Sequence, residues 1–168
     1  MIPVLPTPLE LMLPAMAVLL SFVLLLGIPA LKIKDHRLLL SFSGAFLLGV
    51  TLFELLPEVF DQEMPGKPGV FIAIGILLQI ILEFFSRGAE HGHKHHTNAE
   101  KGFPLLLLIS LGLHAFLEGI PLSVNQGVLW AITVHKIPVA LILGGFLLDS
   151  GLSRNTAWAF IIIFASMT

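Results

Sequence analysis

The sequence has no cysteine and few charged residues. Without cysteine the chain can form neither a disulfide framework nor a thiolate metal site, so any metal site must use other ligands. Asp, Glu, Lys and Arg make up 12% of the residues, whereas a soluble domain usually has about 25%. Hydrophobic residues make up 56%, and the mean hydropathy is +0.96. This composition places the chain among membrane proteins.

The sequence also lacks a positive net charge and the basic start of a secretory signal peptide. Its net charge of −2 gives no sign of the basic surface that a nucleic-acid partner requires. The N-terminal segment MIPVLPTPLELM lacks the basic residues that begin a secretory signal peptide. We therefore expect the first apolar run to be retained as a transmembrane helix.

Five apolar runs are long enough to cross a hydrocarbon core of about 30 Å, which requires roughly 17–25 helical residues. They cover approximately residues 11–31, 38–60, 69–85, 104–124 and 128–148. A sixth begins near Asn155 and reaches Thr168, which is too short to span. Glu54, Pro57 and Glu58 interrupt the second run. We predict an all-α fold: a polytopic transmembrane helix bundle forming a single membrane domain over residues 1–168, with five full spans and a partial sixth.

The basic residues indicate the orientation of the bundle. Seven of the nine fall in three loops that this topology places on one side, namely Lys32, Lys34, Arg37, Arg87, Lys94, Lys101 and Arg154. Lys67 is on the opposite side, and Lys136 lies inside an apolar run. Because short loops rich in Lys and Arg stay in the cytoplasm, we predict that the N-terminus is outside and that residues 86–102 form a cytoplasmic loop. In a bacterium this would be the plasma (inner) membrane.

The predicted cytoplasmic loop is rich in histidine. Four histidines occur within six residues: His91, His93, His95 and His96. Imidazole binds zinc, copper, nickel and iron, and a His-rich tract of this kind can bind such ions loosely. The alternative is a solvated loop whose histidines are incidental. The density of histidines favours metal contact, although the spacing fixes no coordination geometry.

Ionisable residues also occur inside two neighbouring apolar runs. They are His114 and Glu118 in the first, and His135 and Lys136 in the second. Placing such a group at the centre of a lipid-spanning helix costs at least about 2.5–3.5 kcal/mol on insertion scales, so these residues indicate a functional site. His114 and Glu118 are four residues apart and share one helix face.

Helix geometry predicts that these residues converge. Glu118 lies eight residues before the turn at Gln126, and His135 lies nine after it. At 1.5 Å per residue, both are about 12–14 Å from the turn. Two imidazoles and one carboxylate suit zinc or another first-row divalent metal better than calcium or magnesium. The alternative is a structural polar network in which Glu118 pairs with Lys136, and spacing alone leaves both interpretations open.

Two prolines fall beside these residues. Pro121 and Pro138 leave the carbonyls of Leu117 and Val134 without their helical hydrogen bonds. Irregular backbone at membrane depth is tolerated where it faces protein or a wet cavity. The prolines could simply bend their helices, but their position favours a cavity next to the ionisable residues.

Taken together, these motifs resemble a known family. HAFLEG in one run followed by HKIP in the next is similar to the paired motifs of the zinc- and iron-regulated transporter-like proteins, the ZIP family of divalent-metal permeases. The run SFSGAFLLGVTLFELLPE resembles a family segment that ends in Leu-Pro-Glu, with Glu54 where a histidine or acidic residue often stands. A His-rich loop and an outside N-terminus are also family features. The resemblance covers essentially the whole chain.

The resemblance implies roles for particular residues. His114, Glu118 and His135 match the family's first metal site. Independently of the resemblance, the predicted topology places Glu54 and Glu58 toward the outer end of the second run, where they could attract cations at an entrance. The alternative is that they are solvated at the membrane surface, which suits Glu58 better. Many members bind a second ion through polar and acidic residues. The corresponding positions here are Ala115, Lys136 and Val139. The resemblance therefore implies a single-metal site, with the Lys136 ammonium where a second cation would sit.

The resemblance also implies a helix count. The family has eight helices, of which the first, fourth, fifth and sixth are associated with the moving metal-carrying unit. With five spans and part of a sixth, we expect this chain to lack the last helices, leaving the carrier unit incomplete and the scaffold half present.

We therefore expect transport of a divalent cation, Zn²⁺ foremost and otherwise Fe²⁺ or Mn²⁺, into the cytoplasm by alternating access. One alternative is a metal-sensing membrane protein that does not transport, or a subunit completed by another chain. Another is a proton-coupled carrier of a small solute that uses Glu118 and Lys136 as a relay. As partners we expect a divalent metal ion and the lipid bilayer, with a homodimer left open and no nucleic acid. We expect neither enzymatic activity nor a prosthetic group.

Overall fold

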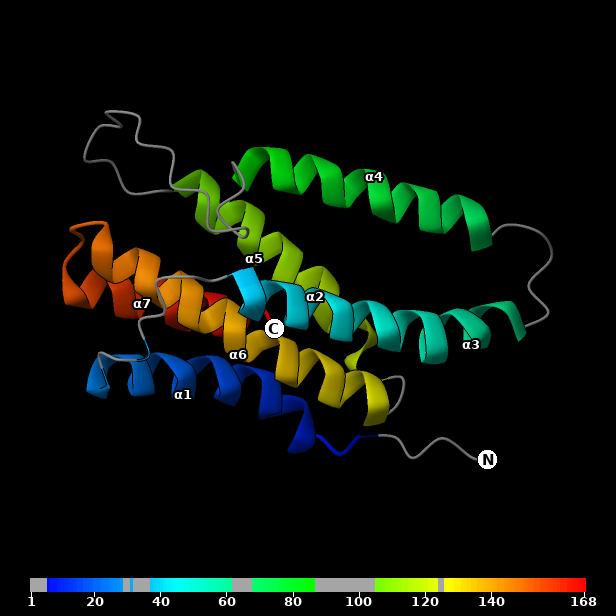
Figure 1. Ribbon diagram of the computed structural model, residues 1–168, viewed down its shortest axis with the longest axis horizontal. Helices are drawn as coiled ribbons and strands as arrows, with labels where there is room; N and C mark the ends of the chain where they lie inside the picture. The colour runs from blue at the N-terminus through cyan, green and yellow to red at the C-terminus, as the bar shows by residue number, and fades with distance from the viewer. Residues whose placement is uncertain (1–5, 29–30, 32–36, 62–67, 87–104, 124–125) are drawn as a thin grey trace.

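The computed structural model describes residues 6–28, 31, 37–61, 68–86, 105–123 and 126–168, and these residues form helices without any strand (Figure 1). The elements are η1 (Glu10–Met12), α1 (Leu13–Gly27), α2 (Arg37–Val50), η3 (Thr51–Leu55), α3 (Leu56–Asp61), α4 (Pro68–Ser86), α5 (Leu105–Gly119), η5 (Ile120–Ser123), α6 (Gln126–Asp149) and α7 (Arg154–Ser166). Successive long helices run in alternating directions (Figure 1). The predicted all-α class is confirmed.

Three of the described helices are long and apolar enough to cross a membrane. They are Glu10–Gly27, Leu38–Asp61 and Gln126–Asp149. The remaining two predicted runs contain shorter apolar helical stretches, Pro68–Leu82 and Leu108–Ser123. The count of five spans and the outside N-terminus therefore stay predictions. Apart from Ser86, which ends α4, the predicted His-rich loop lies outside the described residues.

The start of the first span is fixed by local hydrogen bonds. The Glu10 amide donates to Thr7 Oγ1 (3.3 Å), and the Thr7 amide donates to Glu10 Oε2 (2.7 Å). This reciprocal pair is a capping box, which satisfies amides that have no partner at a helix start. Gln126 Nε2 also donates to Glu10 Oε2 (3.1 Å). The first span is thereby joined to the start of α6.

The predicted interruption of the second span is a change of helix type. Residues Leu38–Asp61 form one apolar helical span, within which η3 is a π-helical turn. Pro57 lies two residues after the end of this turn and has no amide hydrogen to donate to it. A wider π turn is a known way for a helix to absorb such a local mismatch. The span therefore continues through Glu54 and Pro57 without a break.

Helix α6 is the centre of the bundle. It packs against α1, α2 and α7, and Figure 1 shows it running between α1 and α2. The main core joins α1, α5, α6 and α7 through Val18, Phe22, Leu25, Leu108, Leu111, Ala115, Ala140, Leu143, Leu147, Ala157, Phe160, Ile161, Phe164 and Ala165. Helix α6 accordingly has buried residues on nearly every side.

By contrast, α4 contacts mainly α5 and leaves most of its surface uncovered. Its exposed large apolar side chains are Val70, Phe71, Ile72, Ile74, Ile76, Leu77, Ile80, Ile81 and Phe84. Soluble monomers rarely expose a continuous apolar surface of this kind. This surface fits a helix that faces lipid.

Close packing of α1 against α6 depends on Gly144. A Cβ atom at this position would lie 2.8 Å from Phe22 Cδ2 and 2.9 Å from Leu25 Cδ2. The adjacent Gly145 is also buried, but a Cβ atom there would meet nothing within 4 Å. The two glycines therefore form a matched pair for testing this contact.

We predict that Gly144→Val lowers the free energy of unfolding by about 1–3 kcal/mol, the usual cost of overpacking a core. Gly145→Val should have a smaller effect because its side chain enters free space. Thermal unfolding of both purified variants in the same detergent measures the difference. Equal losses of stability would contradict the proposed packing of Gly144 against α1.

Candidate metal centre

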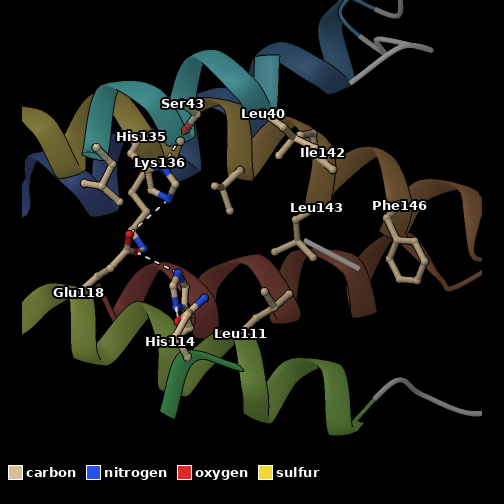
Figure 2. A pocket seen from close by; sticks show the side chains of 14 residues that line it. Leu40, Ser43, Leu111, His114, Glu118, His135, Lys136, Ile142, Leu143 and Phe146 are labelled. Atoms are coloured by element: carbon tan, nitrogen blue, oxygen red, sulfur yellow. Dashed lines mark hydrogen bonds and ion pairs between the residues drawn. The ribbon is translucent and has the colours of Figure 1, made fainter. Parts of the chain in front are cut away.

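A cavity of about 260 Å³ lies among α2, α4, α5 and α6. Its polar end contains Ser43, His114, Glu118, His135 and Lys136 (Figure 2). Gln79 also lines the cavity and contacts His114 there. From its polar end the cavity extends past Leu143 to Leu40, Ile142 and Phe146, and this part is apolar. The four ionisable side chains that line the cavity therefore lie at one end of it.

The three predicted ligands converge at the polar end. Helix α5 presents His114 and Glu118 from one face, and α6 presents His135 from the opposite side of the cavity (Figure 2). His135 Nε2 lies 3.2 Å from Glu118 Oε1, and His114 Nε2 lies 3.8 Å from Glu118 Oε2. One ligand atom from each residue lies within 4.8 Å of the other two. The equal depth inferred from helix geometry is present in the structure.

These distances suit a first-row divalent ion. Zinc bonds of about 2.0–2.1 Å in tetrahedral geometry separate ligand atoms by about 3.3 Å. The His135–Glu118 distance of 3.2 Å already matches this value. Small side-chain movements would bring His114 into the same shell. Three protein ligands leave a fourth position open, as in zinc sites that exchange a bound group.

One oxygen of Glu118 has no hydrogen-bond partner in the part of the chain that the structure describes. Glu118 Oε1 is buried and accepts no hydrogen bond from any described residue. His135 Nε2 is near it but is not aligned as a hydrogen-bond donor. A buried carboxylate oxygen left without a partner is costly, and such atoms require an explanation. A cation between Oε1 and the two imidazoles would satisfy it, so the residues present fit a metal ion.

The outer nitrogens of both histidines have partners on other helices. His114 Nδ1 lies 2.9 Å from Gln79 Oε1 on α4, and His135 Nδ1 lies 2.6 Å from Ser43 Oγ on α2. A carbonyl oxygen only accepts, so His114 Nδ1 must carry the proton, and in the neutral ring Nε2 then has a free lone pair. The lone pair is directed into the site.

Sequence analysis did not identify Gln79 or Ser43 as part of this site. Each is a polar residue in a predominantly apolar run, and this pattern could have indicated them from the sequence. Ser41 gives a similar signal, yet it is exposed.

Lys136 is the most buried ionisable residue of the site, with 1% of its side chain exposed. Its Nζ atom donates to Glu118 Oε2, and it lies 5.3 Å from the centroid of the Phe164 ring. The ion pair and the cation–π contact compensate for removing the ammonium from water. A structural polar network would require Glu118 to pair with Lys136, and this pair is present. The metal-ligand geometry is present as well.

Glu54 lies away from this site. It is exposed on η3, and its carboxylate lies against Gly127 at the start of α6. Gly127 is eight residues before His135, a rise of about 12 Å along the helix. The structure does not bring Glu54 to the three ligands, and its predicted entrance role stays a prediction. The loop histidines His91, His93, His95 and His96 lie outside the described residues.

Comparison of the chain with protein-family models, curated proteins and solved structures gave no match. The resemblance to the ZIP family therefore depends on the motifs alone.

The ion pair between Lys136 and Glu118 can be tested with a double mutant. Glu118→Leu leaves Lys136 charged and unpaired, so we expect it to lower the free energy of unfolding by about 3–5 kcal/mol. Adding Lys136→Met replaces the second charge with a side chain of similar length and should recover most of that loss. Thermal unfolding of the two variants and the unmodified chain in one detergent tests this. Equal instability of the single and double variants would argue against the pair.

Proposed function

We propose that this chain is an integral membrane protein that carries a divalent metal cation, Zn²⁺ foremost, into the cytoplasm through His114, Glu118 and His135. The observation that carries this proposal is the buried Glu118 Oε1 atom. It has no hydrogen-bond partner among the described residues and lies beside an imidazole nitrogen. The metal ion is the transported substrate.

The ligand set supports a first-row metal. Two imidazoles and a carboxylate favour Zn²⁺, Fe²⁺ or Mn²⁺ over the oxygen-seeking Ca²⁺ and Mg²⁺. With three protein ligands and one open position, the site differs from a closed structural zinc site. An incoming water or neighbouring ligand can enter the open position, which favours exchange of the ion.

The charges support binding of one ion. When both imidazoles are neutral, the charges of Glu118 and Lys136 cancel. A divalent ion therefore brings uncompensated positive charge into the buried site, and a second ion would be strongly repelled. In the ZIP family, which the motifs resemble, a second ion uses positions occupied here by Lys136, Ala115 and Val139. Alanine and valine side chains offer no ligand, and ammonium has only donors.

The shape of the cavity supports access from one side. It extends from the ligands toward Phe146 near the end of α6, the side that the basic loops assign to the cytoplasm. Toward the start of α6, buried apolar residues fill the space: Leu122, Val128, Leu129 and Ile132, packed by Leu11, Leu13, Leu47 and Leu55. We call this the Leu129 cluster. Alternating access would require the Leu129 cluster to open when the cytoplasmic side closes.

We predict that His114→Ala abolishes zinc uptake by proteoliposomes, because the site loses one of its three ligands. Phe116→Ala is the control, since Phe116 is 57% exposed on the same helix. Uptake is followed with a trapped zinc-sensitive dye after equal incorporation of each protein. Wild-type uptake by His114→Ala would exclude the site assignment. Zinc binding without uptake by the unmodified chain would instead support a non-transporting sensor or a subunit of a larger assembly.

We also predict a stoichiometry of one zinc ion per intramembrane site. The measurement is calorimetric titration of the full chain after replacement of the four loop histidines by asparagine. The Lys136 ammonium and the absence of further ligands at Ala115 and Val139 account for the limit. Two tightly bound ions that are both lost in His135→Ala would contradict a single-metal site.

A proton-coupled carrier of a small organic solute is the second candidate. The Lys136–Glu118 pair and the apolar end of the cavity favour it, because an amphipathic solute could occupy that end. It predicts transport without any metal requirement. A chelator that abolishes transport distinguishes the metal permease from this alternative.

A further inference from the structure

We propose that Gln79 and Ser43 are positioning residues: Gln79 holds His114 in the tautomer and orientation that metal binding requires, and Ser43 holds His135 in the required orientation. This inference rests on the proposed metal site. Neither residue touches the ion position directly. Each acts on the outer nitrogen of one ligand ring, and each comes from a helix that carries none of the three ligands.

Gln79 determines the state of His114. Its Oε1 atom can only accept, so the contact with His114 Nδ1 requires a proton on that nitrogen. The proton is then absent from Nε2 in the neutral ring, and Nε2 can bind a metal. Without this acceptor the ring is free to carry its proton on Nε2, where it blocks ligation. Gln79 belongs to the narrow face of α4 that is not exposed, whereas its neighbour Ile80 is 57% exposed.

Ser43 contacts the outer nitrogen of His135 at 2.6 Å and thereby orients that ring. Its side chain is directed into the cavity, and the residue is 2% exposed on a helix that is otherwise largely uncovered. A serine hydroxyl can accept a hydrogen bond, so it accommodates the tautomer of His135 in which Nδ1 carries the proton and donates to Ser43 Oγ. In that tautomer His135 Nε2, which lies 3.2 Å from Glu118 Oε1, has a free lone pair for a metal ion. Figure 2 shows the ring between Ser43 and Glu118.

Both outer partners, Gln79 and Ser43, are uncharged, and this favours release of the metal ion. Many metal-binding histidines donate to a carboxylate, which makes the ring a stronger ligand. An amide and a hydroxyl orient the rings without adding negative charge to the site. A site built in this way holds its ion less tightly than one with carboxylate partners. This property suits a transported ion better than a permanently bound one.

The test uses zinc affinity of the full chain with the four loop histidines replaced by asparagine, measured by competition with a chromophoric chelator. We expect Gln79→Leu and Ser43→Ala each to weaken binding about 10–100-fold, the usual effect of losing an outer-shell partner. Ser41→Ala and Ile80→Ala are matched controls at exposed positions beside them and should bind like the parent. Ser43→Thr keeps the hydroxyl and should restore affinity.

Two further readouts separate positioning from general loss of structure. Nitrogen-15 NMR of histidine-labelled, metal-free protein should show His114 protonated on Nδ1 in the parent and as a mixture of tautomers in Gln79→Leu. The His114→Ala spectrum assigns the signal. Gln79→Glu should tighten zinc binding, because it supplies a carboxylate partner.

The outcomes are distinguishable. Parental affinity and an unchanged His114 tautomer in Gln79→Leu, with binding lost in His114→Ala, would overturn the role of Gln79. Parental affinity in Ser43→Ala would do the same for Ser43. Both results would leave the proposed function intact. Undiminished intramembrane binding in His114→Ala would instead overturn the proposed function, whatever the outer-partner variants do.

Discussion

The buried carboxylate of Glu118 determines how this bundle is organised. A carboxylate inside an apolar bundle requires compensation at both oxygens. Lys136 bonds to Oε2, while Oε1 faces His135 without a hydrogen bond. Helices α5 and α6 meet at the turn through η5, and farther along they are bridged by these long polar side chains across a cavity. The polar centre around Glu118 therefore lines one end of the cavity.

The surroundings of Glu118 account for the proposed transport behaviour. One side of the cavity leads toward Phe146, and the other is filled by the Leu129 cluster. The histidines have neutral outer partners, and Lys136 supplies the one positive charge beside the carboxylate. In the proposed function, such a site would attract a single divalent ion without holding it in a closed shell. The proposed transport requires these properties, because a transported ion must be both captured and released.

Much of this arrangement could be predicted from the sequence. Long apolar runs predict helices because a lipid-spanning backbone must satisfy its own hydrogen bonds. The short turn at Gln126 fixes the depth of Glu118 and His135, so their convergence follows from the helical rise alone. Ser43 and Gln79 could not be found in this way. Their roles depend on how α2 and α4 are rotated, and nearly uniform apolar helices carry little periodic signal to fix that rotation.

X-ray absorption at the zinc edge reports directly on the atoms that bind the ion. The sample is the zinc-loaded full chain with its four loop histidines replaced by asparagine. The account predicts a four-coordinate shell at about 2.0–2.1 Å that includes two imidazoles and at least one oxygen, and the loss of one imidazole in His135→Ala. An all-oxygen shell, or a spectrum that does not change in His135→Ala, would contradict the proposal that Glu118 and the two histidines bind the ion.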